Sequence, residues 1–201
     1  MKPTEILSAE HRVIEQVLDC LEKMVEHCGA TGELDKQSAA DAIAFFKMFA
    51  DRCHHGKEEV HLFPAMEARG FPRDSGPTGV MLREHEEGRQ FVRGMESYLD
   101  AAAGGDEQAR KEFCRNARGY LHTLRDHIDK EDHCLFSMAD QAFSDADQQA
   151  LLARFEKVEH EEMGAGTHEK YLDIANRLAE RYGVAKAAAS GNSGCGCHHH
   201  H

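Results

Sequence analysis

A stripe of apolar residues with a histidine and a glutamate set into it constrains the fold of this chain most. Its members are Phe113, Ala117, Tyr120, Leu124, His127, Glu131, Leu135 and Met138. Steps of three and four residues are typical of the buried face of an α-helix. A buried charge is costly unless it is paired or bound to a metal. The stripe therefore predicts a bundle helix with an inward metal-binding pair, His127 and Glu131.

Three further segments carry stripes of the same kind, each with a histidine at one of the inward positions. We expect them to be helices at about residues 4 to 28, 36 to 68 and 79 to 103. Their inward polar residues are His11, His54, Glu58 and His85. The expected helix boundaries include N-caps at Thr4, Asp35 and Asp106 and a helix end before Gly29. Four such helices predict an all-α, antiparallel up-down four-helix bundle.

The C-terminal part of the chain predicts one additional helix. Ser144 begins a Ser-x-x-Asp pattern that resembles a capping box, and the helix should reach Tyr182, with a kink or break near Gly164 and Gly166. The final residues are rich in Ala, Gly, Ser, Cys and His, which predicts a flexible tail whose last four histidines are typical of a purification tag. The predicted domains are a bundle at 1–142, a helix packing on it at 143–184 and a tail at 185–201.

Charge and cysteine content exclude several classes of protein. The net charge of -12 argues against binding to nucleic acid or to an anionic membrane surface. No apolar run approaches the roughly 20 residues that span a bilayer, and the N-terminus has no apolar signal core, so we expect a cytoplasmic protein. Seven cysteines at irregular spacing do not predict a disulfide framework. Five of them are expected to be small buried residues: Cys20, Cys28, Cys53, Cys114 and Cys134.

The two halves of the predicted bundle repeat each other. The matched motifs are Glu10-His11 with Glu84-His85, and His54-x-x-x-Glu58-x-x-x-Leu62-Phe63 with His127-x-x-x-Glu131-x-x-x-Leu135-Phe136. Two similar hairpins predict a pseudo-twofold site of four histidines and two glutamates. Each carboxylate could bridge two metals, and each metal could take two imidazoles. One bridging oxide or hydroxide would make each metal about five-coordinate and leave a position open for a small ligand.

Several assignments stay open at this point. His54 and Glu58 compete with His55 and Glu59, although the first pair keeps the Leu-Phe register and places Ala50, rather than Asp51, upstream on the same face. Residues that are either extra ligands or ordinary polar groups are His61, His160, Glu161, Glu162 and His168. His27, His122 and His133 are expected near the surface. Gly88, one turn from His85, predicts either close packing or a small pocket beside the metals.

With these motifs in place, the sequence resembles the hemerythrin-like, or HHE cation-binding, proteins over roughly residues 5 to 140. The resemblance implies a four-helix bundle with a non-haem di-iron centre held by His11, His54, Glu58, His85, His127 and Glu131. It also implies carriage or sensing of O₂, NO or peroxide, or iron–sulfur repair. The oxygen carriers of that family have another histidine one turn after the third-helix ligand, where this chain has Arg89.

Three classes of function follow from this resemblance and from the site. The first is a binding protein for O₂, NO or peroxide, and the second is an enzyme that reduces peroxide or O₂. The second needs a proton donor near the open position, for which Tyr120 is a candidate. The third is an interaction module without metal. The sequence leaves open whether the protein is an enzyme and which oligomer it forms.

Overall fold

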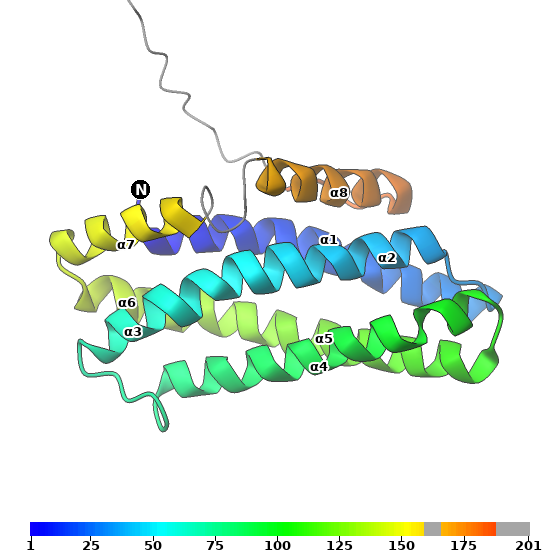
Figure 1. Cartoon of the computed structure of the whole chain (residues 1–201), viewed down its shortest axis with the longest axis horizontal. Helices are drawn as coiled ribbons and strands as arrows, with labels where there is room; N and C mark the ends of the chain where they lie inside the picture. The colour runs from blue at the N-terminus through cyan, green and yellow to red at the C-terminus, as the bar shows by residue number, and fades with distance from the viewer. Residues whose placement is uncertain (159–165, 188–201) are drawn as a thin grey trace, which may run out of the picture.

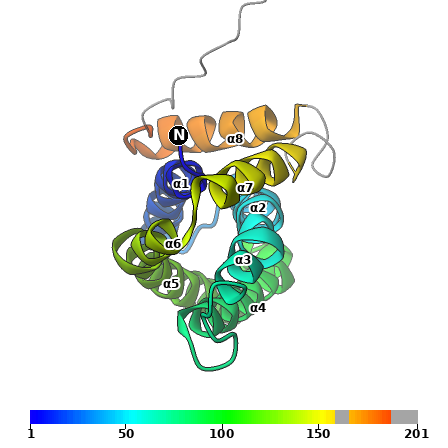
Figure 2. The ribbon, with the colours of Figure 1, turned by 90° about the vertical axis from the view of Figure 1, so that its left-hand side faces the viewer.

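Four long helical rods, packed side by side, form the body of this protein (Figure 1). The computed structural model describes residues 1–158 and 166–187, and this part of the chain contains helices and no strands. The rods are α1 (Pro3–Thr31); α2 (Lys36–Phe45), η1 (Phe46–His55), η2 (Glu58–Leu62) and α3 (Phe63–Glu67); α4 (Pro77–Ala103); and α5 (Glu107–Lys130), η3 (Glu131–Leu135) and α6 (Phe136–Ala142). Successive rods run in opposite directions, as Figures 1 and 2 show, which confirms the predicted all-α bundle.

Side-chain caps fix the starts of the second and fourth rods as the sequence predicts. Asp35 accepts a hydrogen bond from the Ser38 amide, and Asp106 accepts one from the Ala109 amide, both at 2.7 Å. The first rod differs at both ends. Thr4 lies inside α1, where its hydroxyl donates to Asp140 at 2.8 Å, and Gly29 also lies inside the helix. The rod ends instead at Gly32, whose φ of 75° is readily adopted only by glycine.

The rods that carry His54 and His127 contain π-helical stretches, which the sequence analysis did not predict. η1 contains His54, η2 begins at Glu58 and η3 begins at Glu131, so a π-helical stretch starts at the inward glutamate in both halves of the repeat. A π-helix has an i→i+5 bond in place of i→i+4, so its register slips relative to an α-helix. Beyond η3 this slip buries Ala139 in place of the predicted Met138, which is exposed, and beyond η2 Met66 is buried.

Two apolar clusters fill the bundle and leave a polar layer between them. One cluster includes Leu18, Phe45 and Leu121, and the other, towards α3 and α6, includes Leu7 and Phe63. The inward histidines and glutamates lie in the layer between the clusters. Four cysteines are buried as expected, but Cys134 is exposed because the π-helical stretch η3 turns it away from the core.

Two C-terminal helices cover one side of the bundle, where a single additional helix was predicted. α7 (Asp145–Lys157) starts with the predicted Ser144 capping box, and α8 (Thr167–Tyr182) starts after Gly166, whose φ is 81°. Both helices lie across α1 and the second rod (Figure 2). Their buried residues join the two apolar clusters. The predicted domain boundaries stay predictions. No helix within the described ranges is both long and apolar enough to cross a membrane.

Candidate metal centre

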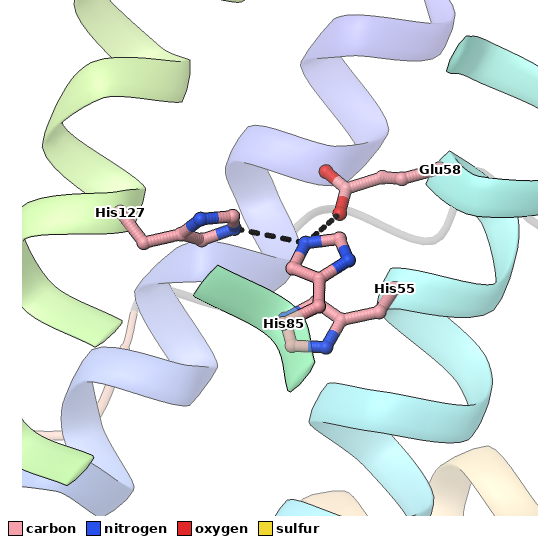
Figure 3. A group of neighbouring side chains, drawn as sticks. All are labelled: His55, Glu58, His85 and His127. Atoms are coloured by element: carbon pink, nitrogen blue, oxygen red, sulfur yellow. Dashed lines mark hydrogen bonds and ion pairs between the residues drawn. The ribbon is translucent and has the colours of Figure 1, made fainter. Parts of the chain in front are cut away.

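The polar layer of the bundle gathers seven buried side chains into two adjoining groups. The His11 group consists of His11, His54, Glu58 and Glu131, and the His55 group consists of His55, Glu58, His85 and His127. Within each group, one nitrogen or oxygen of every residue lies within 4.8 Å of the others. Each of these side chains is at most 3% exposed, so water cannot compensate for their polarity. Figure 3 shows how the His55 group converges from three rods.

Two glutamates join the groups. Glu58 has one oxygen 3.5 Å from His54 Nε2 and the other 3.4 Å from His85 Nε2. Glu131 has one oxygen 3.2 Å from both His11 Nε2 and His127 Nε2. None of the four carboxylate oxygens has a hydrogen-bond donor. Each glutamate therefore faces both groups, as a carboxylate that bridges two cations would.

The tautomer of each imidazole is fixed by a carboxylate behind it. In each case Nδ1 of the histidine donates a hydrogen bond to a carboxylate oxygen. His11 donates to Asp132 and His54 donates to Glu10, both at 2.9 Å. The other pairs are His85 with Glu59 at 2.7 Å, His127 with Glu84 at 3.1 Å and His55 with Asp51 at 3.4 Å. A neutral imidazole with its proton on Nδ1 presents a lone pair on Nε2. This is the arrangement that supports metal-binding histidines.

The inward atoms are therefore nearly all acceptors. Nε2 of His11 lies 3.0 Å from Nε2 of His54, and Nε2 of His85 lies 3.1 Å from Nε2 of His127 (Figure 3). Nε2 of His55 has no hydrogen-bond partner. Lone pairs this close repel unless protons or cations lie between them. The donor set of imidazoles and carboxylates fits iron, and it also fits zinc or manganese.

The comparisons with known proteins agree with this geometry. The family model for the hemerythrin HHE cation binding domain matches residues 2–139. The chain belongs to this hemerythrin family. It is 22% identical to an uncharacterized protein of Mycobacterium bovis over 180 residues, which is 90% of this chain and 70% of that protein. Uncharacterized proteins of two Mycobacterium tuberculosis strains are similar to the same extent. No solved structure matches the chain.

The structure of this hemerythrin domain brings together all six side chains that the sequence singled out: His11, His54, Glu58, His85, His127 and Glu131. It adds a seventh, His55, which the sequence analysis had placed in competition with His54. Both point inward because η1 is π-helical and brings neighbouring positions closer to one face. Glu59 lies outside the layer and holds His85 in place. The layer thus contains five imidazoles, and His55 on the second rod is one of them, whereas Arg89 stands where the oxygen carriers have their extra histidine.

Burial and mutual charge shift the pKa values of these groups. Burial, together with the nearby Glu131, raises the pKa of Glu58 well above its usual value. Burial opposes ionisation of Glu131 as well, but His127 and His11 hold its pKa well below the usual value. Burial lowers the pKa of His54 to about 4, whereas Glu131 and Glu84 outweigh burial at His127 and raise its pKa to about 9. Glu58 and His127 are therefore expected to carry protons when no metal is bound.

Of the possible extra ligands that the structure describes, neither His61 nor His168 joins the two groups. His61 lies beside Phe155, with 6.4 Å between ring centroids, while His160, Glu161 and Glu162 fall outside the described residues. His168 approaches Glu10 and Cys53 in a third set. Both oxygens of Glu10 are already engaged there, one by Lys57 and one by His54, and the buried ammonium of Lys57 opposes a further cation. His27, His122 and His133 are exposed, as predicted.

Tyr120 fills the space beside Gly88. A Cβ added at Gly88 would lie 3.5 Å from Cε2 of Tyr120, which is an ordinary contact. This geometry favours close packing over the alternative of an open pocket. Burial raises the pKa of the Tyr120 hydroxyl well above its usual value, so the residue releases its proton reluctantly. Its role as a proton donor stays a prediction.

Proposed function

We propose that this protein holds two irons in the polar layer and binds a small ligand, O₂, NO or peroxide, at one of them. His11 and His54 would hold one iron, His55, His85 and His127 the other, and Glu58 and Glu131 would bridge them. When bound, such a pair of irons supplies redox chemistry and open coordination positions for diatomic ligands and peroxide.

The unequal number of imidazoles in the two groups carries this proposal. The His11 group offers two imidazoles and the His55 group offers three, around the same pair of carboxylates. Iron accepts up to about six ligands. With both carboxylates shared, the His11 group would offer its metal one ligand fewer than the His55 group offers, which would leave room there for a small ligand. The small ligand is therefore expected beside His11 and His54.

The protein's own residues prepare this site in three ways. Carboxylates behind the imidazoles orient the Nε2 lone pairs. Lys57 and Lys130 bond Glu10 and Glu84, respectively, and so neutralise two of these carboxylates. The apolar clusters on both sides exclude water, which strengthens the interaction between a cation and the carboxylates. Phe136, stacked on the ring of His11 at 5.4 Å, contributes to this apolar wall.

Optical spectroscopy tests the proposal. The metal-free protein is loaded anaerobically with Fe²⁺ and then exposed to O₂ or titrated with NO. An absorption band that reverses when the gas is removed indicates a binding protein. Rapid conversion to a ferric form with continued consumption of peroxide indicates an enzyme, the second candidate. Failure to take up iron would contradict both. A cytoplasmic location remains a prediction.

A further inference from the structure

The third imidazole of the His55 group belongs to a unit that breaks the twofold symmetry of the site. In the repeat, His55 corresponds to Ile128, and Asp51, which accepts from His55 Nδ1, corresponds to Leu124. Ile128 and Leu124 are buried apolar residues. The first half of the bundle therefore carries an imidazole with a carboxylate behind it where the second half carries only hydrocarbon.

Arg89 connects this added unit to the rest of the His55 group. Its Nε donates to Asp51 at 2.9 Å, and its Nη2 donates to Glu59 at 2.7 Å. The same oxygen of Glu59 accepts from Nδ1 of His85 at 2.7 Å. One guanidinium thus contacts both carboxylates that orient the imidazoles of His55 and His85.

These two imidazoles depend on each other's placement. Their rings are stacked, with centroids 3.8 Å apart and an angle of 12° between planes. A rotation of one ring would displace the other. The planar guanidinium can contact two carboxylates in fixed directions, whereas the ammonium of lysine is a point charge without this geometry.

Charge explains why the carboxylates need Arg89. Asp51 and Glu59 together carry two negative charges and share the cation Arg89, which leaves a sum of -1 for the three side chains. The side chain of Arg89 is only 27% exposed, so solvent screens this interaction incompletely. Without the guanidinium, the two carboxylates would repel each other and turn towards water, away from the imidazoles.

We propose that Arg89 is a positioning residue for the His55 group, holding Asp51 and Glu59 so that His55 and His85 aim at the same metal. The inference rests on the proposed two-metal function. Arg89 itself belongs to neither group of inward residues and would act through these two carboxylates. Residues behind metal ligands typically contribute 10- to 100-fold to metal affinity. Loss of Arg89 is therefore expected to weaken one of the two metal positions by about that factor and to leave the other nearly unchanged.

The test compares three variants of the whole chain. Arg89→Gln keeps much of the length but removes the charge, and Arg89→Lys keeps the charge but not the two-carboxylate fork. Arg93→Gln is the matched control, since Arg93 lies one turn further along α4 and bonds the exposed Glu86 at 2.8 Å. Anaerobic titration with Fe²⁺ against a chromogenic chelator gives the two dissociation constants. Circular dichroism checks that each variant keeps its helix content.

We expect one dissociation constant to rise about 10- to 100-fold in Arg89→Gln, a smaller rise in Arg89→Lys and no change in Arg93→Gln. Unchanged constants in Arg89→Gln would overturn the inference, and so would equal weakening of both, which would indicate a general charge effect. If Arg89→Gln does not fold, Arg89→Lys decides: wild-type constants overturn the inference, and weakening at one position supports it. A wild-type protein that binds fewer than two irons would refute the proposed function instead.

Discussion

The packing of Gly88 against Tyr120 makes a quantitative prediction. A methyl group at position 88 would meet the tyrosine ring at 3.5 Å, without overlap. Alanine is more favourable than glycine within a helix by about 0.5–1 kcal/mol. We therefore expect Gly88→Ala to stabilise the protein by that amount. For a domain of this size, about 1 kcal/mol corresponds to a rise of about 2–4 °C in Tm.

Gly119 on α5 is the matched contrast, because it also lies in the interface between α4 and α5, where it faces Phe91 of α4. A Cβ there would overlap the ring of Phe91, whose Cζ lies 2.6 Å away. Overpacking of this kind costs about 1–3 kcal/mol, which exceeds the gain in helix propensity. Gly119→Ala is therefore expected to destabilise the protein by up to about 2 kcal/mol. The opposite signs arise from the neighbours alone, since the substitution is the same.

Thermal unfolding followed by circular dichroism, at equal iron loading, measures both effects. Azide titration of the ferric protein, followed by its charge-transfer band, adds a functional readout. Because Tyr120 fills the space beside Gly88, Gly88→Ala should leave azide affinity unchanged. A loss of stability of more than about 1 kcal/mol, or weaker azide binding, would refute the packing argument. Weaker azide binding would restore the alternative of a pocket beside His85, whereas a loss of stability would indicate overpacking against Tyr120.

Three further predictions concern the metal centre. His54→Ala and His55→Ala should each lose one metal position while Arg93→Ala loses none, measured by iron content; full retention in His55→Ala would exclude His55 as a ligand. Iron loading should raise Tm clearly, because a metal that binds only the folded state stabilises it; equal melting of both forms would argue against a buried site. The pKa of His127 is about 9 without metal, so its imidazole must lose a proton when iron binds. Iron affinity should therefore fall about tenfold per pH unit for each displaced proton as the pH drops from 8 to 6. An iron affinity that does not change with pH would contradict this.

The sequence contains enough information to predict the bundle and six of the seven inward residues. The apolar stripes predict the rods, Asp35 and Asp106 predict the starts of two of them, and Ser144 predicts the start of α7. The internal repeat pairs His54 with His127 and Glu58 with Glu131. These features are local, or recur at a fixed interval, so they can be recognised without coordinates.

The role of His55 could not be derived with an α-helical period. Adjacent residues on an α-helix point about 100° apart, so His54 and His55 look like alternatives. The apolar stripe of the helix predicted at residues 36 to 68 nevertheless had a spacing typical of a π-helix. From Phe46 to Leu62 it advances in four successive steps of four residues, through Ala50, His54 and Glu58. Each such step overshoots an α-helical turn by about 40°, and only a wider helix keeps all five residues on one face.

The carboxylates behind the imidazoles were hidden for a different reason. Glu10, Glu59, Glu84 and Asp132 each precede or follow an inward residue, but they hold imidazoles on other rods. Their partners depend on the packing of the bundle, which the sequence does not state. The break between α7 and α8 was expected from the glycines, whereas its effect, two helices lying across the bundle, required the structure.

The number of irons bound by each chain tests the central claim most directly. A chain that ends at Ala187 lacks the terminal cysteines and histidines, which could bind metal on their own. After anaerobic loading with Fe²⁺ and removal of free iron by gel filtration, iron and protein are measured in the same sample. The two groups of inward residues predict two irons per chain. One iron at saturation would contradict the dinuclear centre, and none would contradict a metal site in the bundle.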